Sequence, residues 1–406
     1  MSRLASRLVR PASLALLAGA ALWLVAAYLL WNATASVPTG PSLSPHRFFS
    51  DSFLRSSSSY ELFLTIDGLL AMVALLVVLV VYARRGHRLM RESAAGRVGT
   101  GMMLGMLGFA VVWLAEIPFG LAAVWWERSH GVSHQGYLAW IFTSFISLGS
   151  TFAFVAMALA IAMGLAGWLG RWWWLVAAPA FVGLALLFTL VSPYLIPDTS
   201  PLRDPGLRAD ARALERKEGV EGTRFVVEDV DRFTTAPNAE ATGLGPTQTV
   251  VLWNTLLSNN FRRAEIRTVL GHEIAHLAHH DPLKQLGWLA LFLLPATGLI
   301  ELLTRRRGGL ARPEAVPVAL LVLIALQLLA TPMFNLVARR VEASADWSAL
   351  EATHEPQAAR AAFRRLSTTS HSSPDPPAWV SLLYGTHPTV MQRIAMTFAW
   401  ERTHQR

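Results

Sequence analysis

Residues 272–276 read His-Glu-Ile-Ala-His, inside a stretch from Asn260 to about His279 whose pattern predicts a helix. Residues four apart share one face of a helix, so His272 and His276 can direct ring nitrogens at a single Zn²⁺. Glu273 lies beside that face, where its carboxylate can take a proton from an attacking water and later return it to the leaving amine. The stretch therefore predicts a catalytic site for one Zn²⁺ per chain.

Such a site needs a third protein ligand and an open fourth position. The chain has no cysteine, so the remaining ligand must be a histidine or a carboxylate. Glu342 and Asp346 are four residues apart on a predicted helix, where Glu342 could bind the metal and Asp346 could orient a ligand histidine. The same spacing also describes a solvated helical face with an Arg–Glu pair, and spacing alone leaves both interpretations open.

The composition around this motif is that of a membrane protein. Of 406 residues, 53% are hydrophobic and only 15% are charged, against about 25% charged in typical soluble domains. The apolar run at the N-terminus continues through Trp31 without a small-residue cleavage site, so we expect an uncleaved span rather than a signal peptide. Segments of spanning length, about 20 apolar residues, predict about seven spans, at 11–31, 60–83, 100–126, 138–168, 172–196, 285–304 and 314–337.

The expected fold is an α-helical polytopic membrane protein with a small α+β zincin-like metalloprotease domain. Residues 1–196 would form a membrane domain of five spans, and residues 197–283 the zinc-protease domain with its His-Glu-Ile-Ala-His helix. Residues 284–337 would add two spans, and 338–406 would supply C-terminal helices that complete the site. Two β-rich runs, 223–227 and 249–253, predict a small sheet. The stretch 247–253 could pair with an extended substrate.

The basic residues bear on partners and on sidedness. The net charge is +8, and arginines cluster beside apolar segments, which is typical of a topology signal and excludes nucleic acid as the expected partner. The clusters within 1–10, 84–97 and 305–312 are expected on the cytoplasmic side. Seven spans would then place a multi-pass protein in the cell membrane with its zinc domain on the extracytoplasmic face.

Five segments, followed by Arg393, carry a further pattern: 127–133 (ERSHGVS), 237–243 (PNAEATG), 250–256 (VVLWNTL), 342–346 (EASAD) and 384–389 (YGTHPT). In this order they resemble motifs of the type I CAAX prenyl protease family, the membrane-bound gluzincins that also include heat-shock quality-control proteases, and 237–243 stands for the family's Asn-Ala-Tyr segment. The resemblance implies a chamber-like helical membrane fold and Glu342 as the third zinc ligand. It assigns Asn238 and His387 to substrate and transition-state stabilisation, and Arg393 to substrate contact.

The resemblance also leaves points open. A histidine donor beside the metal can stabilise an oxyanion, but by itself His387 also fits a capping or turn residue before Pro388. Asn254 stands where the family has Asp, so a role tied to that charge is in doubt. The family's eukaryotic substrates are cytosolic, which implies a cytoplasm-facing site and disagrees with the arginine pattern.

The function expected from these features is peptide-bond hydrolysis at the membrane by a zinc endopeptidase, with the lipid bilayer and a peptide or membrane protein as partners. One alternative is a quality-control protease of broad specificity. Another is a zinc-containing membrane sensor or structural protein, although a structural site would need a fourth protein ligand. Three acids inside apolar segments, Asp67, Glu116 and Glu301, either line a water-filled interior or lie near helix ends. No signal for an oligomeric state is present.

Overall fold

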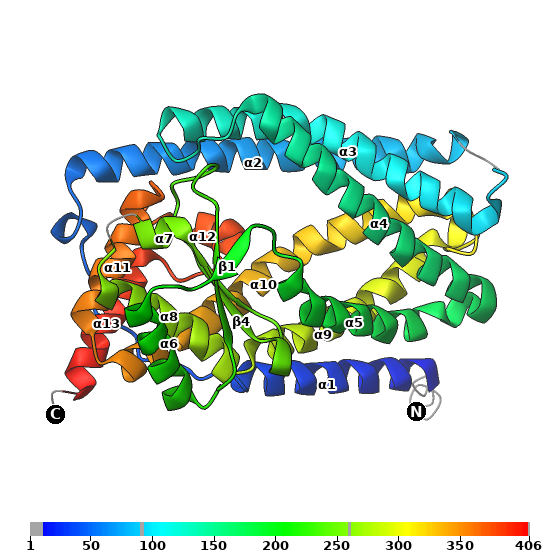
Figure 1. Ribbon diagram of the computed structural model, residues 1–406. Coiled ribbons are helices and arrows are strands. Elements are labelled where there is room, and N and C mark those ends of the chain that lie inside the picture. Colours follow the sequence, from blue (N-terminus) through cyan, green and yellow to red (C-terminus); the bar gives the residue numbers. More distant parts are fainter. Residues whose placement is uncertain (1–10, 90–92, 259–260, 405–406) are drawn as a thin grey trace, which may run out of the picture.

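The long apolar segments form helices. The computed structural model describes residues 11–89, 93–258 and 261–404, and each of the seven expected segments coincides with a helix. These are α1 (Pro11–Asn32), α2 (Asp51–Arg85), α3 (Gly96–Ser129), α4 (Tyr137–Leu169), α5 (Trp173–Val191), α9 (Asp281–Thr304) and α10 (Val316–Thr353). In Figure 1, α1, α4, α5 and α9 extend to one side of the unit that holds the sheet, whereas α2 and α3 run along the length of the molecule and pass over that unit.

Five stretches of the described residues are long and apolar enough to cross a membrane. One of them, 137–194, contains both α4 and α5. These helices are separated at Gly170, whose φ of 56° is a conformation that favours glycine, and Figure 1 shows α5 turning back toward the sheet. The chain is thus an α-helical polytopic membrane protein, as the sequence predicted.

Small residues let the apolar helices approach closely. A Cβ added to Gly101 would lie 2.2 Å from Met163 Sδ, and one added to Gly105 would lie 2.3 Å from Leu159 Cδ1. Both glycines are on α3 and both contacts are on α4, a pattern that favours close packing of membrane helices. The buried cluster around this contact joins six helices through Tyr82, Leu104, Met163, Trp173, Ile300 and Val316.

The polar segment after α5 folds into a four-stranded sheet with strand order β1-β2-β4-β3. The strands are β1 (Thr199–Pro201), β2 (Arg224–Glu228), β3 (Ala239–Thr242) and β4 (Thr249–Trp253). The central pair, β2 and β4, is parallel and matches the two predicted β-rich runs, while β1 and β3 are antiparallel edge strands. One face of the sheet packs against α6 (Pro205–Glu218) and α8 (Arg263–Ala278) through residues that include Val250, Leu252 and Ile274.

The prediction that residues 247–253 pair with a substrate is wrong. Residues 249–253 of this stretch form β4, whose backbone is paired with β2 on one side and with β3 on the other. A strand with two neighbours has no free backbone groups for a third. The free edge nearest β4 belongs to β3.

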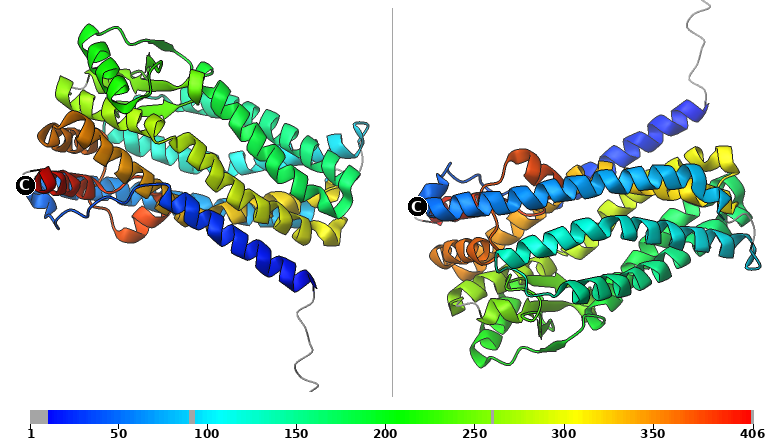
Figure 2. Two further views of the ribbon diagram at one scale, coloured as in Figure 1. Left: turned by 90° about the horizontal axis from the view of Figure 1, so that it is seen from below. Right: turned by 90° about the horizontal axis from the view of Figure 1, so that it is seen from above.

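The C-terminal helices pack on α8 and on the end of α10. These helices are α11 (Pro356–Thr369), α12 (Ala378–Tyr384) and α13 (Val390–His404). The short α7 (Asn254–Ser258) lies earlier in the chain, between β4 and α8. Leu350 of α10, Phe363 of α11, and Ile394 and Trp400 of α13 share one buried cluster. Figure 2 shows these helices gathered at one end of an elongated molecule. Through α11, this C-terminal group therefore lies beside the His-Glu-Ile-Ala-His helix.

Candidate metal centre

The helix that carries the motif is buried on most of its surface. Leu270 and Ile274 are fully buried, and His272 and Glu273 are each only 6% exposed. Gly271 allows α10 to lie close, because a Cβ there would already be 3.4 Å from the Cα of Ala349. This crossing of α8 and α10 brings the two histidines to Glu342.

Three ligand atoms converge at the crossing. His272 Nε2 lies 3.1 Å from His276 Nε2 and 3.0 Å from Glu342 Oε2, and His276 Nε2 lies 3.6 Å from the same oxygen. Ligands about 2.0–2.1 Å from a tetrahedral zinc would be about 3.3–3.4 Å apart. Among the described residues this is the one group of three or more metal-binding side chains that meets so closely. Its spacing fits an ion of that size.

The state of Glu342 Oε2 also fits a metal ligand. This oxygen is buried and has no hydrogen-bond partner within the described chain, although ring nitrogens surround it. An unsatisfied buried carboxylate oxygen is costly. A cation between the carboxylate and the two rings would remove that cost.

The remaining ring nitrogens are held by carboxylates. His272 Nδ1 lies 2.9 Å from Asp346 Oδ1, and His276 Nδ1 lies 2.9 Å from Asp281 Oδ2. Because a carboxylate can only accept, each Nδ1–H donates, and each Nε2 is left free for a metal. Arg393 in turn donates two hydrogen bonds to Asp346, at 2.7 and 2.6 Å.

Asp281 was not singled out from the sequence. It is 1% exposed and also pairs with Lys284 at 2.9 Å. The available signal was its position, because Asp281-Pro282 follows directly after the motif helix and starts α9. The chain turns back there, and this turn brings the carboxylate to His276.

The carboxylates make the site favourable for positive charge. Burial lowers the pKa of His272, but the charge of Asp346 and its hydrogen bond to His272, together with the nearby carboxylate of Glu342, raise it to about 9. Burial likewise lowers the pKa of His276, and Asp281 and Glu342 raise it well above its usual value. Without a metal, these carboxylates therefore favour the protonated form of the histidine pair.

Glu273, Asn238 and His387 line the same cleft, of about 570 Å³, as the three ligands. His387 Nε2 lies 3.1 Å from Glu342 Oε2, and its side chain is 52% exposed. The loop before His387 is fixed to α10 by Arg339, which donates to the carbonyl oxygens of Ser381 and Gly385 at 2.6 and 2.8 Å. The structure thus brings together every residue that the sequence analysis assigned to the site.

Other residues that the sequence analysis left open have structural partners. Asn254 Oδ1 accepts hydrogen bonds from the backbone N–H groups of Val230 and Asp231, and its Nδ2 donates to Asp229 at 2.6 Å. The amide thus braces the loop after β2. Glu301 is buried near the end of α9, where it accepts from Trp173 Nε1 at 2.8 Å and pairs with Arg305.

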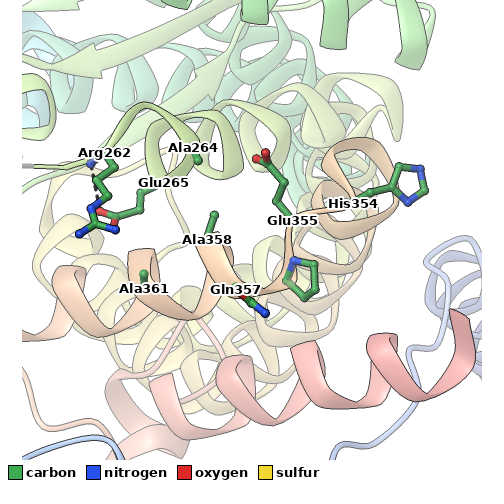
Figure 3. Close-up of a pocket in the computed structure, with 9 residues that line it drawn as sticks. Arg262, Ala264, Glu265, His354, Glu355, Gln357, Ala358 and Ala361 are labelled. Atoms are coloured by element: carbon green, nitrogen blue, oxygen red, sulfur yellow. Dashed lines mark hydrogen bonds between the residues drawn. The ribbon is translucent and has the colours of Figure 1, made fainter. Parts of the chain in front are cut away.

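A second cavity, of about 590 Å³, lies between the start of α8 and the corner from α10 to α11 (Figure 3). Its two carboxylates already have partners, because Glu265 pairs with Arg365 and Glu355 pairs with Arg267. This cavity offers no unpaired carboxylate for a metal or a proton transfer.

Known proteins show similarity over the same elements. The sequence profile of Peptidase family M48 matches residues 201–401. The uncharacterized metalloprotease YhfN of Bacillus subtilis (strain 168) is 27% identical over 295 residues, which cover 69% of this chain and 69% of that protein. A protease HtpX homolog of Acidiphilium cryptum (strain JF-5) is 30% identical over 213 residues, which cover 47% of this chain and 72% of that protein.

The crystal structure of S. mikatae Ste24p shares the fold. It superposes with a TM-score of 0.72 at 18% identity and covers 93% of this chain and 96% of its own. The match extends over the apolar helices as well as the sheet and the helices of the site, and it agrees with the resemblance to type I CAAX prenyl proteases. The chain therefore belongs to peptidase family M48 and is a membrane metalloprotease.

Proposed function

We propose that this protease is a zinc endopeptidase in which His272, His276 and Glu342 hold one Zn²⁺. The observation that carries the proposal is the convergence of three ligand atoms at 3.0–3.6 Å around a buried Glu342 oxygen that lacks a hydrogen bond. When bound, Zn²⁺ polarises the substrate carbonyl and lowers the pKa of water toward about 7.

The side chains around the ligands then perform the proton transfers. Glu273 accepts a proton from the attacking water, whose oxygen forms a bond to the carbonyl carbon, and returns the proton to the amine nitrogen as the C–N bond breaks. His387 donates its Nε2–H to the developing oxyanion from the exposed side of the cleft. Asn238 and the free edge of β3 hold the peptide backbone, since residues 238–243 line the cleft.

Binding through an edge strand supports the quality-control alternative as well. Main-chain hydrogen bonds tolerate many side chains, so a protease of broad specificity fits this cleft. A structural or sensor zinc site fits less well. Such a site takes four protein ligands, and the converging group in the described part of the chain contains only three.

We also propose that the catalytic cleft faces the extracytoplasmic side. Two of the arginine-rich segments meet in the structure, where Arg307 Nη1 lies 3.3 Å from His87 Nδ1. In Figure 1 the turn that joins α9 to α10 lies at one end of the molecule, and the sheet lies in the other half, next to the C-terminal helices. Both facts support a cytoplasmic position for the arginine-rich segments and an extracytoplasmic position for the cleft.

The test uses Glu273→Gln and His272→Ala in the purified, detergent-solubilised protein, with casein and a lipidated peptide as substrates. We expect Glu273→Gln to keep about one metal per chain and to lose hydrolysis by at least about 10²–10⁴-fold, because the glutamate acts on water rather than on the metal. His272→Ala should lose metal and hydrolysis together. Retention of a full metal content in His272→Ala, or continued cleavage by Glu273→Gln, would contradict the assignment.

A further inference from the structure

The cleft contains one carboxylate that the proposed mechanism does not use. Glu240, in the middle of edge strand β3, lines the cleft together with Glu273 and the metal-ligand residues. Its side chain is exposed, and no hydrogen bond or ion pair to it occurs among the residues that the structure describes. In the segment that resembles the family's Asn-Ala-Tyr, Glu240 occupies the position of the tyrosine.

The strand register fixes the direction in which Glu240 points. Ala239 and Ala241 are paired with Leu252 and Val250 and pack with them against the core beneath the sheet. Because side chains alternate along a strand, Glu240 lies on the opposite face together with Thr242. The Thr242 hydroxyl is 3.3 Å from that of Ser192, just beyond the end of α5. Glu240 therefore stands at the rim between the strand edge and α5.

The other charges of the site are balanced. Asp346 is paired with Arg393, and Asp281 with Lys284. The proposed Zn²⁺ offsets Glu273 and Glu342. Glu240 adds a negative charge, and no cation forms an ion pair with it in the described part of the chain. Partial desolvation in the cleft, followed by the negative charges of Glu228 and Glu273, raises the pKa of Glu240.

A peptide that adds to the edge of β3 would place one side chain beside this carboxylate. Residues directly opposite each other on paired strands point to the same face, with Cβ atoms about 4.5–5.5 Å apart, and opposite charges in such pairs attract. An acidic side chain there would be repelled. A lysine or arginine would supply the missing cation.

We propose that Glu240 is a specificity-determining residue that selects substrates with a lysine or arginine side chain near the scissile bond. This inference rests on the proposed function, because it takes the cleft to be the peptide-binding site. Glu240 acts on the choice of substrate and has no part in the proton transfers.

The test uses sets of three fluorogenic peptides that are identical except at one position, which carries Lys, Gln or Glu. Separate sets place this variable position at each of the three residues on either side of the cleaved bond. The zinc-loaded protein in detergent is compared with its Glu240→Gln and Glu240→Lys variants. The quantity measured is the ratio of kcat/KM between the Lys and Glu peptides. Effects of a substitution on general activity cancel in this ratio.

At one position we expect the wild-type protein to prefer the Lys peptide over the Gln peptide by about three- to fivefold, the upper range for an opposite-charge cross-strand pair. The preference should vanish in Glu240→Gln, reverse in Glu240→Lys, and weaken when the ionic strength is raised. Glu228→Gln is the matched control. It removes a carboxylate from the same face of the sheet, but Glu228 does not line the cleft. Because loss of the Glu228 charge favours the ionised form of Glu240, the preference for the Lys peptide should persist in this control.

The outcomes separate this inference from the proposed function. Cleavage without a charge preference in the wild-type protein, or an unchanged preference in Glu240→Gln, would overturn the inference alone. Absence of any Glu273-dependent cleavage would overturn the proposed function and the inference with it.

Discussion

The carboxylate of Asp346 connects the metal site to the C-terminal helix, and its substitution by asparagine tests two roles at once. Asp346 is 1% exposed, lies 2.9 Å from His272 Nδ1 and accepts two hydrogen bonds from Arg393. Asp346→Asn keeps the volume and one acceptor oxygen but removes the charge. The substitution should therefore weaken both the hold on His272 and the ion pair with Arg393.

The structure sets the size of each effect. The Arg393 side chain is only 13% exposed, and removal of one partner from a buried ion pair costs about 3–5 kcal/mol. Since asparagine can still accept one hydrogen bond, we expect the lower end, about 3 kcal/mol of unfolding free energy. Loss of the carboxylate behind a metal-binding histidine lowers metal affinity by about 10–100-fold.

The assay separates these two effects by a matched control. Asp210 forms a similar two-hydrogen-bond pair with Arg263, at 2.6 and 2.8 Å, and contacts neither metal-binding histidine. Because the Arg263 side chain is 56% exposed, Asp210→Asn should cost only about 1 kcal/mol and leave the metal affinity unchanged. Thermal unfolding in detergent, with and without Zn²⁺, reports stability, and competition with a chelator reports affinity.

One result would refute this reasoning. The Asp346→Asn variant could be destabilised and still bind Zn²⁺ within about twofold of the wild-type affinity, instead of the expected loss of at least about tenfold. That result would mean that the carboxylate acts through Arg393 alone. In that case His272 does not depend on Asp346 for its orientation.

The remaining predictions concern Asp281, the pH dependence of Zn²⁺ binding and the side of the membrane that the cleft faces. Asp281→Asn should lower Zn²⁺ affinity by about tenfold, the lower end for such a change, because the amide oxygen can still accept from His276; an unchanged affinity in the chelator assay would exclude this role. Because metal binding requires a neutral His272, whose pKa is raised to about 9 without metal, Zn²⁺ affinity should fall by about tenfold per pH unit as the pH drops below that value. Titration calorimetry in buffers of different ionisation enthalpy should detect the released protons, and a pH-independent affinity from 6 to 9 would contradict it. Finally, in this cysteine-free chain, a cysteine placed at Ser200 should react with an impermeant maleimide in intact cells and one placed at Ala94 should not; the reverse labelling would put the cleft in the cytoplasm.

The sequence by itself determined the features that depend on short-range patterns. Apolar runs of spanning length coincide with helices of the structure, and the helical spacing of His272 and His276 places both rings on one face. The two β-branched runs became the central parallel strands. These features could be predicted because helix periodicity and membrane insertion depend on neighbours within about 20 residues.

Edge strands were harder to predict. β3 reads Ala-Glu-Ala-Thr and has four residues, of which only Thr242 is β-branched. Such a segment has little strand propensity of its own. It forms a strand because it pairs with the free edge of β4. This pairing gives β4 a neighbour on each side and makes β3 the exposed edge of the cleft.

Tertiary structure decided which side chains support the metal ligands. The contact of Arg393 with Asp346 joins residues 47 apart, and Asp346 in turn lies 74 residues from His272. No local spacing encodes such pairs, because they depend on the crossing of α8 with α10 and on the packing of α13 beside it. Asp281 reaches His276 only because the chain turns between α8 and α9. The histidine pair was readable from the sequence because both rings share one helix face, and Glu342 and Asp346 were candidates because they share another. The pairing of each histidine with its own carboxylate was not readable, because Asp346 and Asp281 belong to different elements that meet the rings only when the chain has folded.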